Sequence, residues 1–328
     1  MKGRISFKNG AVQHIYQRTT DGGLIFYSAR DYLVLFTVIM IVARKYRVRI
    51  LGLCFMVDHI HILIEAPSAE ELHRFVRDYS SWCASLWNAH YGQNGPLFKG
   101  QYGYASKVSD KDIRSAIAYL YNNPVEKQIC TRAEQAQWNF LAYGKCSNPF
   151  SGPWHMKTAS AAMRRAAQQI RALTDLGRPL NYAQLERMAA GLGPLQQKQL
   201  TDYIITRYNR IDYAAAASYF GGFDKLVAAI NTTKGSEYSI REDFTSGSDR
   251  IYSKMTNLLL ETKAIDKIDD LLRLDEKSRV SLLEPLCVAT GASERKAAKY
   301  LHLTLNEGRK PAASQARVED KQLTSSAL

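Results

Sequence analysis

The stretch from Val57 to Glu65 has the sequence VDHIHILIE, in which polar and apolar residues alternate. This period of two predicts a β-strand, because successive side chains on a strand point to opposite faces. His59 and His61 then project from one face, about 7 Å apart, while the isoleucines project from the other and can be buried under helices. Two imidazoles at this spacing can bind one divalent ion. Most His-x-His pairs bind none, so the spacing alone leaves a metal site open.

Strand and helix signals alternate on both sides of this strand. Strands are expected over residues 14–19, 48–55, 60–64 and 97–108, and helices over 29–46, 70–89 and 109–122. Pro124 is expected to end the last helix. The order strand, helix, strand, strand, helix, strand, helix is typical of a ferredoxin-like antiparallel sheet with helices packed on it. The sequence therefore predicts an α+β domain over residues 1–150.

Beyond about Trp154 the strand signals disappear, and an all-α region is expected. Residues 155–245 form a helical region without recognisable chemistry, with a polar, loop-like stretch from Lys234 to Asp249. Residues 250–305 form a second helical region, and residues 306–328 a polar tail that is expected to be disordered. Helices are expected over 158–173, 182–190, 196–208, 213–220, 251–274 with a break, 276–289 and 293–302.

The end of the second helical region has the form of a helix-turn-helix, with Gly291 in the turn and Ser293 as the cap of the second helix. Its apolar side would face the core, and its basic side would face a duplex groove. The apolar residues are Ala297, Ala298 and Leu301, and the basic residues are Arg295, Lys296 and Lys299. An ordinary helical hairpin with a solvated charged face is the alternative.

The composition favours a phosphate-rich partner, since Lys and Arg number 44 and Asp and Glu 31, a formal charge of +13. Five scattered cysteines without a CxxC pair argue against a disulfide framework or a zinc finger and favour a reducing cytoplasm. No signal peptide is recognisable. The apolar run over 32–43 is too short to span a membrane, so it is expected to be a buried helix.

Tyr119 and Asn123 are four residues apart near the end of the third predicted helix, so they lie on one helix face. A phenol can attack phosphorus and conserve the phosphodiester bond energy in a covalent phosphotyrosine. With an ordinary pKa near 10 it needs help from a metal ion or a base. Most tyrosines instead pack their rings in the core, which is the alternative for Tyr119.

Several short motifs occur together in one order along the chain. They are Gln17-Arg18, LCFMVDHIH from Leu53 to His61, GPLFKGQY from Gly95 to Tyr102, and YLYNNPV from Tyr119 to Val125, followed by Trp138 and Tyr143. Over residues 10 to 145 the chain resembles the single-tyrosine HUH transposases, and most of all the repetitive-extragenic-palindrome-associated (REP-associated) tyrosine transposases. The resemblance implies an HUH nuclease domain that cuts and rejoins single-stranded DNA through a 5′-phosphotyrosine.

The resemblance also implies the roles of individual residues. His59 and His61 would bind Mg²⁺ or Mn²⁺, with Asn123 as the third ligand, and Tyr119 would be the nucleophile. Tyr121 is a rival nucleophile, but it faces about 200° around the helix from Tyr119. The family usually has proline two residues before the first histidine, where this chain has Val57, so the turn is less rigid while both ligands are kept.

The implied substrate is a single strand folded into an imperfect hairpin, with duplex DNA as a further partner of the helix-turn-helix. Candidate contacts in the first domain are Arg18, Lys99, Gln101, Tyr102 and Lys107. A non-catalytic DNA-binding regulator with the same fold is the main alternative. A replication initiator or relaxase is less favoured, since the chain has one tyrosine motif and no GxxxxGK[ST] sequence of a helicase P-loop. The sequence leaves the oligomeric state, monomer or dimer, open.

Overall fold

The computed structural model describes residues 7–20, 22–100, 102–232 and 250–304. Its first part contains β1 (Val12–Arg18), α1 (Ala29–Lys45), β2 (Arg49–Met56), β3 (His59–Glu65), α2 (Ala69–Tyr91), β4 (Gly103–Lys107) and α3 (Asp110–Glu126). The four strands form an antiparallel sheet in the order β2-β3-β1-β4, the ferredoxin-like arrangement. The predicted α+β fold, a four-stranded antiparallel sheet with packed helices, is confirmed.

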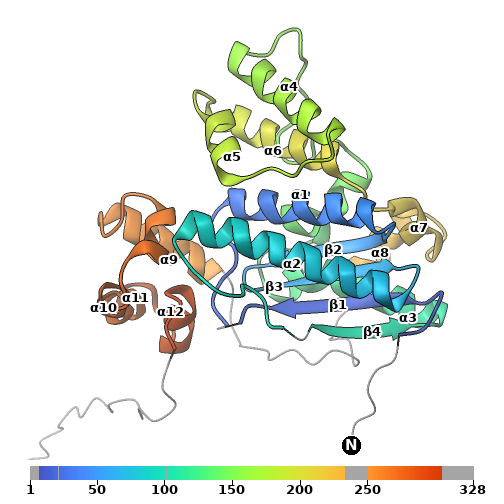
Figure 1. The fold of residues 1–328 in the computed structure, drawn as a ribbon, viewed down its shortest axis with the longest axis horizontal. Coiled ribbons are helices and arrows are strands. Elements are labelled where there is room, and N and C mark those ends of the chain that lie inside the picture. Colours follow the sequence, from blue (N-terminus) through green and yellow to red (C-terminus); the bar gives the residue numbers. More distant parts are fainter. Residues whose placement is uncertain (1–6, 21, 101, 233–249, 305–328) are drawn as a thin grey trace, which may run out of the picture.

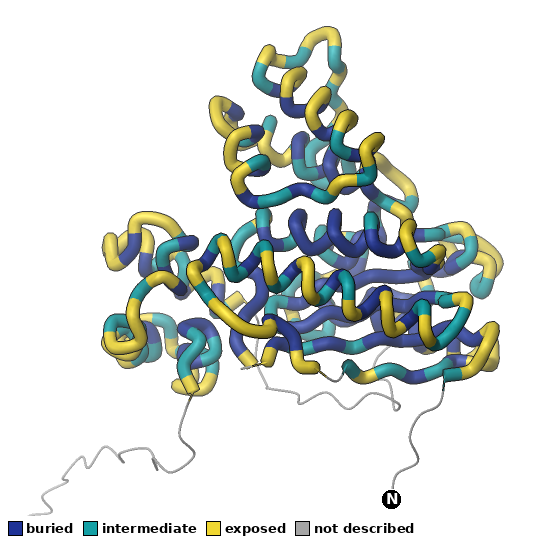
Figure 2. Tube along the Cα trace, in the orientation of Figure 1, coloured by how far each residue is buried: buried dark blue, intermediate teal, exposed yellow. Residues whose placement is uncertain are grey.

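Helices cover both faces of this sheet, with α1 and α2 on one face and α3 on the other (Figure 1). The isoleucines of β3 are buried under α1 and α2, as the alternating pattern predicted. On the other face Leu63 and Cys54 pack against Ile117 and Leu120 of α3. The sheet and α1 are therefore buried along most of their length (Figure 2).

Helix α3 approaches the sheet closely at Gly52 of β2. A Cβ atom at this position would lie 3.3 Å from Leu120 Cδ2, which is tighter than an ordinary van der Waals contact. It would lie 3.5 Å from the ring of Tyr121, which is an ordinary contact. The missing side chain thus lets α3 pack directly on β2. Since α3 carries Tyr119, Gly52 helps to set the height of that residue above the sheet.

The structure corrects the expected end of α3, which continues through Pro124 to Glu126. Proline lacks an N–H group, so the last turn loses one internal hydrogen bond. Bonds from Lys127 N to Asn123 O (3.0 Å) and from Ile129 N to Pro124 O (2.9 Å) hold the turn instead. Three short 3₁₀ helices follow: η1 (Ala133–Gln135), η2 (Gln137–Asn139) and η3 (Leu141–Gly144).

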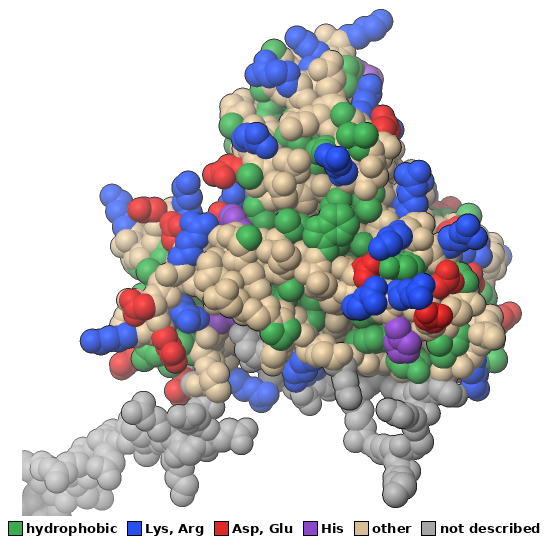
Figure 3. All heavy atoms as spheres, viewed as in Figure 1, with side chains coloured by type: hydrophobic (Ala, Val, Ile, Leu, Met, Phe, Trp, Pro, Cys, Tyr) green, Lys and Arg blue, Asp and Glu red, His purple; other side chains and the backbone are tan. Residues whose placement is uncertain are grey.

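The middle of the chain is helical, with α4 (Ala161–Asp175), α5 (Tyr182–Ala189), α6 (Pro194–Tyr208), α7 (Tyr213–Ser218) and α8 (Phe223–Thr232). Helices α4 to α6 stack over α1 (Figure 1), and their side chains, such as Ile170 and Ile204, join the same core as Phe36 and Ile39. Lys and Arg side chains stand out from this part of the surface, and others are spread over the rest of the visible face (Figure 3). Helix α8 was not predicted; Leu226 and Ile230 bury it against the core beneath α3.

The last described part contains α9 (Arg250–Glu261), η4 (Ile268–Arg273), α10 (Glu276–Ser281), α11 (Leu283–Thr290) and α12 (Glu294–Tyr300). The helix expected over 276–289 is divided in two at Leu282. The helices of this last described part share an apolar core with Leu24, which precedes α1. The polar stretch expected over 234–249 and the tail expected over 306–328 lie outside the described residues.

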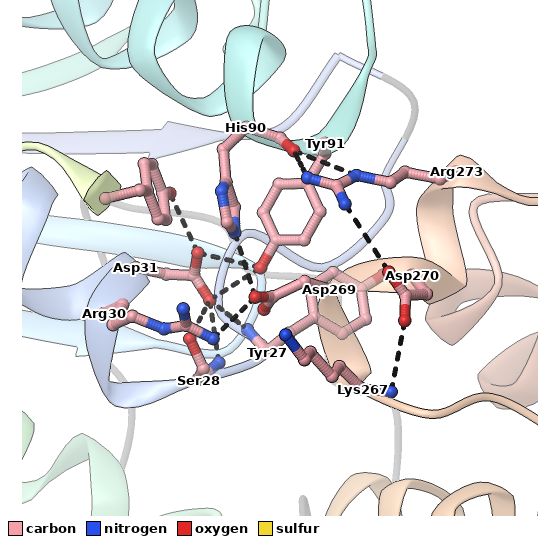
Figure 4. A network of polar contacts seen from close by, with 11 residues as sticks. Tyr27, Ser28, Arg30, Asp31, His90, Tyr91, Lys267, Asp269, Asp270 and Arg273 are labelled. Atoms are coloured by element: carbon pink, nitrogen blue, oxygen red, sulfur yellow. Dashed lines mark hydrogen bonds and ion pairs between the residues drawn. The ribbon is translucent and has the colours of Figure 1, made fainter. Parts of the chain in front are cut away.

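A buried carboxylate joins three parts of the chain at the start of α1 (Figure 4). Asp31 accepts hydrogen bonds from the backbone N–H groups of Tyr27 (2.8 Å) and Ser28 (2.7 Å), as a capping residue does at a helix N-terminus. The hydroxyls of Tyr91 on α2 and Tyr182 on α5 donate to it at 2.9 and 2.8 Å. Burial raises the pKa of Asp31, although these donors oppose the shift.

A second carboxylate ties the C-terminal helices to the first domain (Figure 4). Asp269 of η4 accepts a hydrogen bond from Arg30 Nη2 at 2.6 Å, and His90 Nε2 lies 3.4 Å from the same oxygen. Burial alone would raise the pKa of Asp269, yet His90 and the Arg30 guanidinium hold it below its ordinary value. Arg273 adds bonds to the carbonyl of His90. The C-terminal helices are thus fixed to α1 and α2 by charge as well as by apolar packing.

We expect Arg30→Met to lower the free energy of unfolding by about 1–3 kcal/mol at pH 7, because a buried carboxylate loses its charged donor. A carboxylate whose pKa is depressed by folding stabilises the fold above its unfolded pKa, near 4, and loses this contribution as the pH falls through the folded pKa. The difference between wild type and Arg30→Met should therefore shrink below about pH 4. Urea unfolding at several pH values measures it, with Lys277→Met as an exposed control. An equal difference at all pH values would contradict the assignment.

Within the part of the chain that the structure describes, no helix is both long and apolar enough to cross a membrane.

Candidate active site

The strand pairing brings polar residues of β1 beside the two histidines of β3. In the antiparallel register Tyr16 lies opposite His61, and Arg18 lies opposite His59. Because side chains alternate along a strand, His14 projects from the same face as these two residues of β1. The ring centroid of Tyr16 lies 5.3 Å from that of His59 and 5.0 Å from that of His61. The face of the sheet under α3 therefore carries a cluster of polar rings.

Tyr119 and Asn123 of helix α3 pack against this cluster. The Tyr119 ring stands edge-on to His61, with centroids 5.7 Å apart, and 6.2 Å from the His14 ring. Asn123 Nδ2 lies 3.3 Å from His61 Nε2, although the two residues are 62 positions apart. All of these side chains are buried, and Tyr119 keeps 2% of its surface exposed. The sequence-predicted nucleophile and the predicted ligands His61 and Asn123 meet in one place.

His61 contacts a polar partner through each ring nitrogen. Its Nδ1 lies 3.1 Å from His14 Nε2, and its Nε2 faces Asn123. One tautomer satisfies both contacts: His61 donates its Nδ1 proton to His14, and its Nε2 accepts from the Asn123 amide. This arrangement directs the Nε2 lone pair of His61 towards α3.

His59 has a matching partner in the turn before β3. Its Nδ1 lies 2.6 Å from Asp58 Oδ1. The other carboxylate oxygen of Asp58 forms an ion pair with Lys299 of α12, 241 residues further along the chain. Burial would raise the pKa of Asp58, but the His59 ring and the Lys299 ammonium outweigh it and hold this pKa well below its ordinary value. Asp58 therefore stays a carboxylate in the fold.

Tyr121 points away from this cluster. Its ring is fully buried against β2, and its hydroxyl donates to Leu51 O at 3.3 Å. Burial raises the pKa of Tyr121 well above its ordinary value, so its phenolate is strongly disfavoured. Of the two tyrosines in this motif, the ring contacts with the histidines belong to Tyr119.

Two of the predicted DNA contacts lie near the histidines. The Arg18 guanidinium lies over the Tyr16 ring, 5.2 Å from its centroid, and its Nε donates to the Tyr16 hydroxyl. Lys99 is exposed, and its backbone N–H donates to Arg18 O at 3.0 Å. A positive charge therefore stands at the end of β1, opposite the start of the His59 strand.

Of the other candidates in the first domain, Tyr102 lies on the opposite face of the sheet, whereas Lys107 pairs with Val12 and faces the same side as His14. The Tyr102 hydroxyl lies 2.6 Å from His73 Nδ1 of α2, and so belongs to the opposite face of the sheet. Lys107 is buried on β4, and burial lowers its pKa. Gln101 lies outside the described residues.

Helices α11 and α12 have the local features expected from the sequence. Gly291 has a positive φ of 71° at the end of α11, and the Ser293 side chain accepts from Lys296 N. Ala297, Ala298 and Leu301 are buried, as predicted. Arg295 is exposed and Lys296 half-buried, whereas Lys299 points back into its own chain towards Asp58.

Sequence reasoning missed three residues of this cluster: His14, Tyr16 and Asp58. The first two stand at alternate positions of VQHIYQR, a strand with polar side chains on both faces, so their pattern did not distinguish a site from a solvated face. Gln17, which follows Tyr16, bonds with Tyr79 and Ser80 of α2 on the other face.

No three His, Cys, Asp or Glu side chains in the described ranges lie close enough together to hold a metal ion. A site at this place would have to include the amide of Asn123 as well as the histidines. A 180° rotation of that amide would exchange its nitrogen and oxygen, and Oδ1 would then face the same space as His61 Nε2. Two imidazole nitrogens and one amide oxygen are a donor set that divalent ions accept.

Comparison with known proteins agrees with this arrangement. Residues 24–123 match the family model described as "Transposase IS200 like", a segment that includes both histidines, Tyr119 and Asn123. The resemblance to the tyrosine transposases is thereby confirmed. Strand β1, which carries His14 and Tyr16, lies before the segment that matches this family model.

A solved structure described as a REP-associated tyrosine transposase bound to a REP hairpin is also similar to this chain. It is 15% identical in sequence, has a TM-score of 0.38, and the similarity covers 47% of this chain and 92% of that chain. No curated protein matches the chain.

Proposed function

We propose that this protein is a metal-dependent single-strand DNA transposase that cuts and rejoins hairpin-forming DNA through a 5′-phosphotyrosine at Tyr119. The observation that carries the proposal is the meeting of Tyr119 and Asn123 of α3 with His61 of β3, whose ring lies 5.0 Å from that of His59. An ordinary core tyrosine would be surrounded by apolar side chains, whereas this ring lies among imidazoles. The match of residues 24–123 to IS200-like transposases supports the same class.

In this proposal His59, His61 and Asn123 would hold Mg²⁺ or Mn²⁺, which when bound would polarise the scissile phosphate. Asp58 and His14 would keep the two rings in the tautomers that direct Nε2 to the ion. Asn123 would bind the ion through its amide oxygen.

In the proposed reaction Tyr119 supplies the nucleophile. The Tyr119 oxygen attacks phosphorus and loses its proton, and the bond from phosphorus to the 3′ oxygen of the preceding nucleotide breaks. The products are a 5′-phosphotyrosine and a free 3′ hydroxyl, which gains a proton. The reverse attack by a 3′ hydroxyl restores the phosphodiester and releases Tyr119. No energy source beyond the conserved phosphodiester is needed.

Arg18 and Lys99 would bind the DNA backbone next to the site, because both lie at the end of β1 opposite His59. Gln101, Tyr102 and Lys107 remain predicted contacts. Arg295 and Lys296 of α12 would bind duplex DNA if α11 and α12 act as a helix-turn-helix. The same prediction for Lys299 would require its ion pair with Asp58 to open.

The experiment that tests the function uses labelled single-stranded oligonucleotides that fold into imperfect hairpins with unpaired flanks, incubated with the full chain and Mn²⁺ or Mg²⁺. We expect nicking at one position and a protein–DNA adduct that survives denaturation, with Tyr119 carrying the 5′ phosphate in peptide mass spectra. Tight hairpin binding without any adduct would instead support a non-catalytic DNA-binding regulator. Adduct formation on another residue would overturn the assigned nucleophile.

His14→Phe tests the role of the strand β1 residue that sequence reasoning missed. Phenylalanine keeps the ring but cannot accept from His61 Nδ1, so we expect Mn²⁺ affinity to fall by about 10- to 100-fold. Titration of the DNA-free protein with Mn²⁺, followed by electron paramagnetic resonance of the free ion, measures the change. The exposed His155→Phe serves as the matched control. Unchanged affinity in His14→Phe would show that His14 does not orient the metal ligand.

A further inference from the structure

We propose that Lys299, in the C-terminal helix α12, is a positioning residue for His59 and acts on it through the carboxylate of Asp58. The inference rests on the proposed function, in which His59 is a metal ligand. It assigns to the C-terminal helices a part in building the nuclease site, separate from any contact that they make with DNA.

The three side chains form a continuous line of polar contacts. His59 Nδ1 lies 2.6 Å from Asp58 Oδ1, and the second oxygen of that carboxylate pairs with Lys299 Nζ. The exposed fractions of the side chains are 6% for His59, 17% for Asp58 and 23% for Lys299. Water therefore competes weakly for these contacts, and each charge depends on its neighbour for compensation.

The chemistry of the line fixes the orientation of the imidazole. A carboxylate that accepts the Nδ1 proton of a histidine leaves the lone pair on Nε2 and sets the ring plane. A carboxylate bound on one oxygen alone can rotate. With Lys299 on the other oxygen, Asp58 has one orientation, and His59 has one tautomer.

Helix α12 is well placed to hold this charge still. Its residue Tyr300 accepts a hydrogen bond from the Tyr27 hydroxyl (2.6 Å) on its backbone oxygen, and His302 Nε2 lies 2.8 Å from Leu24 O. The segment before α1, which contains Leu24 and Tyr27, is bound in turn to the turn before β3, since Ile25 N donates to Val57 O at 2.8 Å. Helix α12, the segment before α1 and the turn that carries Asp58 are thus linked in one unit.

This placement differs from what a DNA-contacting lysine needs. A lysine that binds phosphate is a solvated charge on the surface. Arg295, one turn earlier on α12, is exposed, whereas Lys299 is directed into the protein. The basic face predicted from the sequence therefore divides into an outer part and an inner part with different roles.

The test uses the full-length, metal-free and DNA-free chain labelled with ¹⁵N at histidine. Long-range ¹H–¹⁵N spectra report which ring nitrogen of His59 carries the proton. We expect a single Nδ1–H tautomer in the wild type and a mixture in Lys299→Met. Mn²⁺ affinity should fall by about tenfold or more in Lys299→Met, as for other groups that orient metal ligands, and Lys299→Arg should restore most of it.

Matched variants separate positioning from loss of structure. Lys277→Met makes the same change at an exposed position of α10 and should leave both readouts unchanged. Tyr27→Phe removes the bond to Tyr300 O, one of the contacts that hold α12, but keeps Lys299, so it should change the His59 tautomer less than Lys299→Met does. Asp58→Asn should lower Mn²⁺ affinity by itself, and adding Lys299→Met to it should cause no further loss.

A native His59 tautomer and wild-type Mn²⁺ affinity in Lys299→Met would overturn the inference, as would additive losses in the double variant. Thermal unfolding of each variant shows whether it is folded; should Lys299→Met unfold, Lys299→Gln and the Asp58→Asn pair decide by the same readouts. Absence of DNA cleavage by the wild type would refute the proposed function, yet the tautomer measurement would still give its own answer.

Discussion

Tyr119→Phe is expected to abolish the covalent protein–DNA adduct and hairpin nicking. Phenylalanine lacks the oxygen that would attack phosphorus, and loss of the nucleophile costs on the order of 10⁶-fold in other enzymes with covalent intermediates. The ring contacts with His14 and His61 remain, so the fold should persist. Denaturing gels of labelled hairpin incubated with Mn²⁺ measure the adduct, and filter binding measures whether the hairpin is still bound.

Tyr121→Phe is the matched control for this experiment, two residues away on the same helix. It removes a hydroxyl that donates to Leu51 O inside the core, so it should lower the free energy of unfolding by about 1 kcal/mol and leave the adduct intact. If Tyr119→Phe kept full cleavage while Tyr121→Phe lost it, the assignment of the nucleophile would be reversed. Retention by both single variants would refute attack by either residue alone.

His61→Ala is expected to have the second-largest effect, because His61 lies at the centre of the cluster. Loss of a ligand to a Lewis-acidic ion removes several kcal/mol of transition-state stabilisation, at least about 100-fold in the rate of nicking. The substitution also leaves His14 and Asn123 without their shared partner, at about 1–3 kcal/mol of stability. Nicking rates over a range of Mn²⁺ concentrations, together with urea unfolding, separate the two effects.

The exposed His155→Ala controls for the loss of a histidine, and chelation of divalent ions in the wild type should reproduce the loss of nicking. Restoration by excess Mn²⁺ in His61→Ala would indicate a weakened site, and no restoration a destroyed one. Wild-type nicking by His61→Ala without added metal would contradict the proposed metal site.

The fold of the first domain could be predicted because its signals are local. Alternation at His59 to Ile64 and helical spacing in α2 fix which face of each element is apolar, and the element order then indicates the ferredoxin-like sheet. Helical spacing predicted that Tyr119 and Asn123 share one face of α3 and that Tyr121 lies about 200° away from Tyr119. That the face with Tyr119 meets the histidines was implied by the resemblance to the HUH transposases.

The remaining parts of the site depend on pairings between distant residues. His14 joins the cluster because the register between β1 and β3 brings it against His61, which is 47 residues further along the chain. A local sequence pattern does not specify such a register. Lys299 has the spacing of a solvated helix face with Arg295, and only the docking of α12 turns it inwards. Charged residues on a short helix give no local signal of which one will be buried.

The domain boundaries near residues 150 and 250 also stay a prediction. Helices α4 to α6 pack their apolar side chains into the same core as α1, so composition changes near Trp154 while the packing continues across it. The loss of strand signals marks a change of secondary structure and is by itself a weak guide to where one folding unit ends.

The contact between Lys299 and Asp58 has a consequence for how the protein is made. During synthesis, His59 and Tyr119 leave the ribosome long before residue 299 has been added. A nascent chain therefore carries the proposed nucleophile and metal ligand without the helix that holds His59. A product truncated before α12, from a premature stop codon or a decaying gene copy, would keep the recognisable motifs and lack that support. Under the proposed function, newly synthesised chains would acquire full cutting ability only after α12 has been made.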